Sequence, residues 1–183
     1  MPAEWKDMSP AMSLLNRLPG RPDEGQERIR PLWHRVVGIA REPGWYAKGG
    51  IADTLPGRFD AVTLVLALVM LRMDGEPALR APAARLTELF VMDMDGQLRQ
   101  SGVGDLVVGK KVGKLMGALG GRIDAYRDAL AQPDDAMLIA AIERNVTLGE
   151  DGDPAAIAKE MRVLAANLTA LSNVELLTGT IER

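Results

Sequence analysis

The sequence predicts an all-α fold, a single globular domain of about five principal helices with one or two short ones. Apolar residues recur at steps of three and four over long segments, and no segment alternates apolar and polar residues as a half-buried strand would. Each break between these segments carries Pro, Gly or Asp, the residues that end or cap helices. A length of 183 residues fits one domain.

The amino-terminal residues 1–30 are predicted to be a flexible leader and linker, followed by a helical domain over 31–183. Residues 1–11 carry no apolar stripe, and residues 19–30 are rich in Pro, Gly and charge, which favours a polar connection. The leader has no apolar stretch suited to a signal peptide, so we expect a cytoplasmic protein. The longest apolar run, 61–71, is too short to span a bilayer.

The first helix is expected over 31–41, because Pro31 suits the first turn, where its missing N–H is not needed. Glu42, Pro43 and Gly44 then end this helix. A short turn with a flexible glycine break is expected over 45–50.

The segment 56–73 is predicted to be the central helix of the fold. Its residues are apolar nearly all round, so no face of the helix suits water. Asp53 or Thr54 can cap its start, and Gly75 and Pro77 end it.

The remaining helices are expected to start at residues that begin helices well, namely Pro82, Asp105, Pro133 and Asp153. They should cover 82–100, 105–130, 133–146 and 154–171, and a short turn should form over 175–177.

Composition excludes several function classes. Lys and Arg total 22 against 25 Asp and Glu, and a net charge of -3 gives no reason to expect a general nucleic-acid binder. The absence of Cys excludes disulfides, thiolate metal sites and Cys nucleophiles. The single histidine, His34, excludes a metal site built from several imidazoles and any two-histidine mechanism. We therefore expect no catalytic, cofactor-binding or metal-binding residues.

Three short strings resemble ligand loops without completing them. Gly104–Lys110 fits GxxxxGK, but Lys111 stands where Ser or Thr should hold magnesium, and a helix is expected where a strand should precede. Asp93–Gly96 and Glu150–Asp153 resemble pieces of calcium loops but lack the ligand spacing. These strings favour helix breaks, caps and solvated acids.

The helix expected over 105–130 gathers cations on one face. Lys110, Lys111, Lys114 and Arg122 fall in one arc of the helix, apart from the apolar arc that should face the core. Three of the chain's lysines lie here, and no acid occurs over 106–123. Such a face is often merely solvated. The sharper prediction is a docking surface for RNA phosphate, a lipid headgroup or an acidic protein face.

Five glycines in the same helix cost about 4–5 kcal/mol relative to alanines. Close approach of another helix would offset this cost, so we expect tight helix–helix packing along the glycines at 109, 113, 117, 120 and 121.

Two blocks of residues carry a family resemblance. The first, over 46–60, includes Asp53, Gly57, Arg58, Phe59 and Asp60. The second, over 90–126, includes Asp93, Asp95, Arg99, Gly102, Gly104, Asp105 and Gly109 with the basic residues Lys110, Lys111, Lys114 and Arg122. Through these blocks the chain from Leu32 to Leu171 resembles the ubiquinol–cytochrome c chaperone family, whose mitochondrial members assist the biogenesis of cytochrome b.

The resemblance implies an all-α, non-enzymatic assembly factor without a cofactor, which binds newly made cytochrome b, the translation machinery or both. A ribosome, a small partner protein and the anionic inner face of the membrane are the further partners that it suggests, and no DNA partner is expected. Two other functions stay open. One is a nucleotide-binding enzyme that uses Gly104–Lys110, and the other is a helical adaptor or DNA-binding regulator, against which Gly113 and Gly117 argue.

Overall fold

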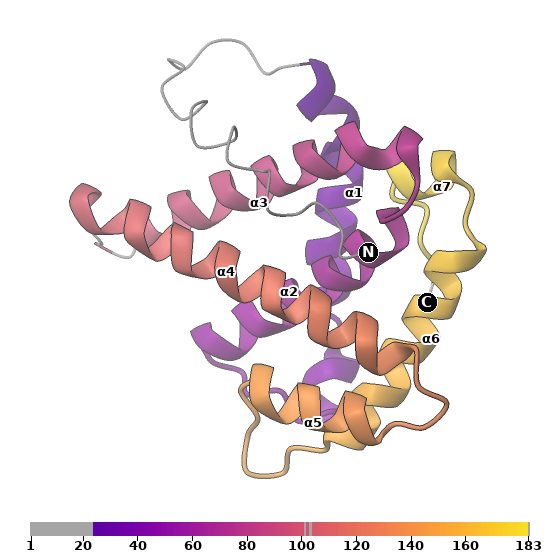
Figure 1. The fold of residues 1–183 in the computed structure, drawn as a ribbon. Coiled ribbons are helices and arrows are strands. Elements are labelled where there is room, and N and C mark those ends of the chain that lie inside the picture. The colour runs from indigo at the N-terminus through magenta and orange to yellow at the C-terminus, as the bar shows by residue number, and fades with distance from the viewer. Residues whose placement is uncertain (1–23, 101, 103, 183) are drawn as a thin grey trace.

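Figure 1 shows the computed structural model, which describes residues 24–100, 102 and 104–182. The regular structure in these residues is helical, apart from one isolated bridge between Ile51 and Leu148. The α-helices are α1 (Glu24–Ala40), α2 (Leu55–Met73), α3 (Arg80–Gln100), α4 (Asp105–Leu130), α5 (Ala136–Asn145), α6 (Pro154–Ala170) and α7 (Asn173–Leu177). A π-helical turn, η3 (Gly44–Lys48), and a 3-10 turn, η4 (Pro77–Leu79), join them. The all-α prediction is confirmed.

Helix α2 is the centre of the fold, as its composition predicts. It packs against α1, α3, α4 and α6, and every side chain over 63–70 is buried. Thr54 caps it by accepting a hydrogen bond from the Gly57 N–H at 3.3 Å, and Pro56 stands in the first turn.

The other helices surround α2 on several sides (Figure 1). Helices α1 and α3 pack on each other, and α7 packs beside α1. Helix α4 crosses α2, with α3 along its first half and α5 against its second half, and α5 in turn packs against α6 (Figure 1). The rings of Trp33, Phe90 and Phe59 link α1, α3 and α2, with ring centroids 6.1 and 6.3 Å apart. This packing leaves the start of α4 at the edge of the molecule (Figure 1).

The start of α1 differs from the prediction. The helix begins at Glu24, so Pro31 lies inside it, and residues 24–30 are helical and not part of a linker. Ile29 is buried and extends the apolar stripe of Leu32 and Val36 by one turn toward the amino terminus. The prediction started the helix at Pro31 and so left this turn out. The predicted leader over 1–23 lies outside the described residues.

The segment expected as a turn over 45–50 is more ordered than predicted. The Trp45 indole is buried and donates to the Ile39 carbonyl at 2.9 Å, and the Tyr46 hydroxyl donates to the Ala40 carbonyl at 2.9 Å. Both bonds satisfy carbonyls in the last turn of α1, which have no partner within the helix. The two aromatic side chains therefore hold η3 against the end of α1.

Two further helix starts differ from the prediction by two or three residues, whereas α4 begins at Asp105 as predicted, with Gly104 in the cap position. Helix α5 begins at Ala136, whose N–H donates to the Asp134 carboxylate at 3.0 Å, and α3 begins at Arg80. Within the described residues, no helix combines the length and the apolar character that a bilayer crossing requires.

Candidate functional site

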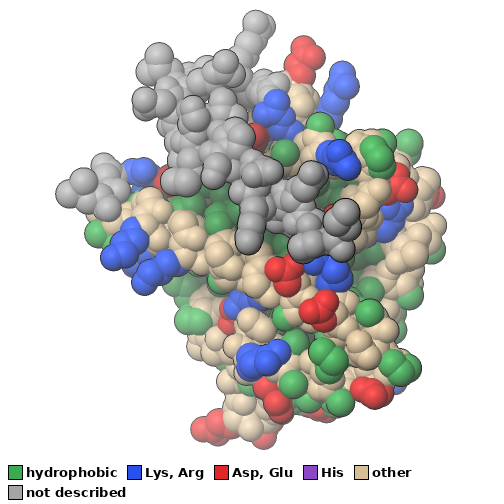
Figure 2. Space-filling view, viewed as in Figure 1, with side chains coloured by type: hydrophobic (Ala, Val, Ile, Leu, Met, Phe, Trp, Pro, Cys, Tyr) green, Lys and Arg blue, Asp and Glu red, His purple; other side chains and the backbone are tan. Residues whose placement is uncertain are grey.

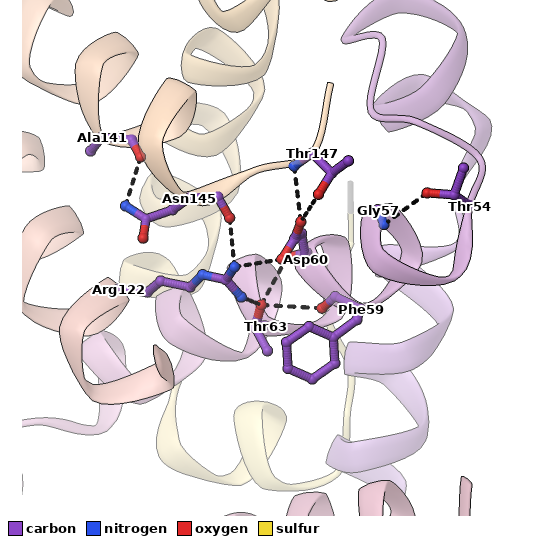
Figure 3. A network of polar contacts seen from close by, with 9 residues as sticks. All are labelled: Thr54, Gly57, Phe59, Asp60, Thr63, Arg122, Ala141, Asn145 and Thr147. Carbon is purple, nitrogen blue, oxygen red and sulfur yellow. Dashed lines mark hydrogen bonds and ion pairs between the residues drawn. The ribbon is translucent and has the colours of Figure 1, made fainter. Parts of the chain in front are cut away.

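The predicted cation face divides into two parts, because Arg122 does not belong to the surface. Only 8% of Arg122 is exposed, and its Nη2 donates to Asp60 Oδ1 at 2.5 Å and to the Asn145 carbonyl at 2.6 Å (Figure 3). Its Nη1 donates to the Thr63 hydroxyl. The prediction that Arg122 offers its charge to a partner beside the lysines is therefore wrong. Its guanidinium instead binds residues of α2 and the last residue of α5.

Asp60 is the acceptor at the centre of this buried network. Its Oδ1 accepts from Arg122, while its Oδ2 accepts from the Thr147 N–H at 2.9 Å and from the Thr147 hydroxyl at 2.6 Å (Figure 3). Both carboxylate oxygens are thus engaged, as burial of a charge requires. The network ties α2, α4 and the segment after α5 together.

A pair of crossing loops holds Thr147 in place. The Ala52 N–H donates to the Thr147 carbonyl at 2.9 Å, and the Gly149 N–H donates to the Gly50 carbonyl at 2.8 Å. Gly50 has φ of +67°, and a Cβ there would lie 2.5 Å from the Cα of Gly152. The segment before α2 and the segment after α5 are therefore joined by backbone bonds at a point where glycine is needed.

The first family block builds this junction. Gly57 faces the Ala52 carbonyl so closely that a Cβ would lie 2.0 Å from its oxygen. The Arg122 guanidinium lies 5.7 Å from the centroid of the Phe59 ring, within the range of a cation–π contact. Asp53 and Arg58 form an exposed ion pair at 2.6 Å, and the hydrogen bond from Arg58 lowers the pKa of Asp53.

The second family block forms the hairpin between α3 and α4. Arg99 pairs with Asp95 at 2.7 Å one turn earlier, and Asp93 accepts from Gln97 at 3.3 Å. Gly102 adopts φ of +83° between the helices. Asp93 and Asp95 bind side chains of their own helix, so these acids of the string 93–96 stabilise α3. In the same way, Asp153 of the string 150–153 caps α6.

The nucleotide-loop resemblance is excluded by the backbone. Residues 105–110 lie inside α4, and α3 precedes them. A phosphate-binding loop instead wraps its N–H groups around the phosphates between a strand and a helix. Within the described residues, no three His, Cys, Asp or Glu side chains gather as a metal ion would need.

Lys110, Lys111 and Lys114 do form an exposed face. All three are exposed near the start of α4, and no ion pair joins any of them to an acid whose side chain the structure describes. Lys and Arg side chains gather over this end of the helix, at the left of Figure 2. We call Lys110, Lys111 and Lys114 the lysine face. The opposite side of α4 is in the core, where Leu119 and Tyr126 are buried as predicted.

The glycines of α4 do not pack against another helix, contrary to prediction. Gly109, Gly113, Gly117, Gly120 and Gly121 are exposed, and a Cβ built on any of them would meet nothing within 4 Å. The apolar arc of α4 is supplied by larger residues, so the glycines are left on the solvent side next to the lysine face. Their cost to helix stability is not offset by packing within the described chain.

An open pocket lies beside the Asp60–Arg122 pair. Its volume is about 290 Å³, close to the lower limit of about 300 Å³ for small-molecule sites. Its lining consists of Pro56, Phe59, Asp60, Arg122, Arg144, Asn145, Val146 and Thr147. Sequence reasoning identified Phe59 and Asp60 through the family block but missed Arg144 and Thr147, because no local pattern marks residues that meet only through folding.

Tyr126 lies one turn after Arg122 and is fully buried. Its hydroxyl has no hydrogen-bond partner in the described structure, and burial raises its pKa to about 12. The unpaired buried hydroxyl of Tyr126 destabilises the folded state, because it has given up its hydrogen bonds to water without gaining others.

Comparison with known proteins identifies the family. The family model described as ubiquinol-cytochrome C chaperone matches residues 47–182, which include α2 to α7, the second motif block and all but the first residue of the first block. The chain belongs to this family. A search of the curated proteins finds no match. Among solved structures, the family fold appears in the crystal structure of the Cbp3 homolog from Brucella abortus. That chain is 32% identical, with a TM-score of 0.74 over 86% of this chain and 90% of that one.

Proposed function

We propose that this protein is a non-enzymatic assembly chaperone of ubiquinol–cytochrome c reductase that binds newly made cytochrome b. The observation that carries the proposal is the family match, which extends over 47–182 and is supported by a solved structure at 32% identity. The family description names a chaperone, and the buried polar network of Asp60 and Arg122 joins helices. The proposal therefore assigns the protein a binding function and no reaction.

The lysine face is the surface we propose for an anionic partner of this assembly. Three exposed cations lie within two turns of α4, and no acid occurs over 106–123 to neutralise them. The second half of the same helix is anchored in the core, since Ile123 and Tyr126 are buried. The charge is thus presented on a helix that is held at its other end, which suits a ribosome that is translating cytochrome b, or the anionic inner face of the membrane.

The partners can be identified by purification from the source cells. We would tag the full chain, purify it at low salt and identify the proteins that come with it. Cytochrome b should be recovered, and ribosomal proteins should accompany it if the chaperone binds during synthesis. Ribosome recovery should fall as salt rises, because exposed charges are screened. Recovery of other proteins with no cytochrome b would instead favour a generic helical adaptor.

The lysine face is tested by charge reversal. The variant Lys110→Glu, Lys111→Glu, Lys114→Glu should fold, since exposed charges contribute little to stability. A matched control is Lys48→Glu, Arg80→Glu, Lys159→Glu, which changes the net charge equally at exposed positions elsewhere. Only the first variant should lose membrane or ribosome binding. Equal loss in both variants would show that net charge matters and that the lysine face does not.

A further inference from the structure

The pocket beside the Asp60–Arg122 pair contains one positive charge, that of Arg144, which no described carboxylate neutralises. Asp60 and Arg122 neutralise each other, and both Asp60 oxygens already accept hydrogen bonds. Arg144, in the last turn of α5, is exposed and lines the pocket, and no described side chain pairs with it. A negatively charged group entering the pocket would therefore meet a free guanidinium and no free carboxylate.

Part of the remaining wall of the pocket is apolar, beside the polar residues Asn145 and Thr147. Pro56, Phe59 and Val146 line it, and Leu55, the residue before Pro56, is 71% exposed. An exposed leucine in the first turn of α2 gives the pocket an apolar neighbour that water does not favour. The volume of about 290 Å³ is large enough for one side chain of a partner and lies at the lower end of the range for small-molecule sites.

We propose that this pocket binds a carboxylate side chain, Glu or Asp with apolar neighbours, of a partner polypeptide. The Arg144 guanidinium presents a planar fork that matches a carboxylate with two parallel hydrogen bonds. Pro56, Phe59 and Leu55 receive the apolar residues beside it. A phosphate of a nucleic acid or a free phosphate suits the pocket less well, because its lining holds one unpaired cation and an apolar wall.

This site is distinct from the lysine face and does not depend on the proposed function. Lys114 and Arg122 are eight residues apart on α4, a rise of about 12 Å along the helix. Arg122 is buried, whereas the lysines point to solvent. A peptide measurement in vitro can fail without bearing on cytochrome b, and the purification from cells can fail without bearing on the pocket.

The test uses nuclear magnetic resonance of the isotopically labelled full chain with three probes: acetyl-Leu-Glu-Leu-amide, acetyl-Leu-Gln-Leu-amide and inorganic phosphate. The Glu peptide should shift the backbone amide signals of Val146 and Thr147. The Gln peptide should bind about tenfold more weakly, because hydrogen bonds to an ionised carboxylate are roughly twice as strong as those to a neutral amide.

Arg144→Gln should abolish the preference for the Glu peptide, while the exposed control Arg80→Gln should keep it. Thermal unfolding of both variants should match the wild type, which shows that the fold is retained. The proposal is overturned if both peptides shift these signals equally, if neither does, or if Arg144→Gln keeps the preference. Shifts of equal size with phosphate would show a general anion site in place of a polypeptide site.

Discussion

Asp60 of α2 and Arg122 of α4 are 62 positions apart in the chain, yet they form a 2.5 Å ion pair whose side chains are each only 9% exposed. Each residue comes from a different family block, so the pair is where the two blocks meet. Thr63, Asn145 and Thr147 complete its hydrogen bonds. The pair therefore fixes α4 on the central helix.

Loss of one member of this pair should destabilise the fold strongly. Asp60→Asn leaves the Arg122 charge buried without a counter-charge and should lower the free energy of unfolding by about 3–5 kcal/mol. Chemical denaturation followed by circular dichroism measures this. The control Asp53→Asn breaks an exposed pair and should change stability little. If the two variants are equally stable, the buried pair does not hold α4 in place.

Gly57 should not tolerate a side chain. In Gly57→Ala, the new Cβ would lie 2.0 Å from the Ala52 carbonyl oxygen, and backbone cannot move away as a side chain can. We expect the free energy of unfolding to fall by more than about 2 kcal/mol. A denaturation midpoint equal to that of the wild type would contradict the close approach of α2 to the segment before it.

Gly117 should behave in the opposite way. It lies inside α4 with nothing within 4 Å of a built Cβ, so alanine meets no clash and removes the entropic cost of glycine. Gly117→Ala should raise the free energy of unfolding by about 0.5–1 kcal/mol. The same denaturation series measures it, and a loss of stability would mean that the glycine side of α4 is packed after all.

Tyr126 should make the protein sensitive to alkaline conditions. Its pKa is raised by burial from 10.0 to about 12, so the folded state resists losing this proton while the unfolded state loses it near pH 10. The stabilising contribution is complete below pH 10 and is lost as pH rises toward 12. Tyr126→Phe also removes an unpaired buried hydroxyl. Between pH 10 and 12 the wild type should lose more stability than Tyr126→Phe, and parallel pH profiles would contradict this.

Local signals predicted the helices well. Thr54 with Pro56, and Asp153 with Pro154, are capping and first-turn residues whose effect depends on neighbours in the chain, and the structure confirms both helix starts. The predicted start of α1 was wrong, because Ile29 stands among polar residues before Pro31 and its place in the apolar stripe of the helix is not evident from the sequence.

The site was predicted less well, because it depends on contacts between distant segments. On a helical wheel Arg122 falls beside the lysines, and only the position of Asp60 on α2 decides that it is buried. Arg144 and Thr147 have no sequence pattern and line the pocket only through the loop crossing. The glycines of α4 are compatible with either packing or exposure, and the path of the neighbouring helices leaves them exposed.

The proposed assembly function is tested most directly by the level of cytochrome b in the source organism when its own copy of this chain is replaced. Cells that carry the Lys110→Glu, Lys111→Glu, Lys114→Glu variant should accumulate less cytochrome b than cells with the wild type or with Lys48→Glu, Arg80→Glu, Lys159→Glu. Immunoblots should show equal amounts of the three chains. Normal cytochrome b with the first variant would make the lysine face an ordinary solvated surface, and normal cytochrome b in cells lacking the chain would contradict the assembly function itself.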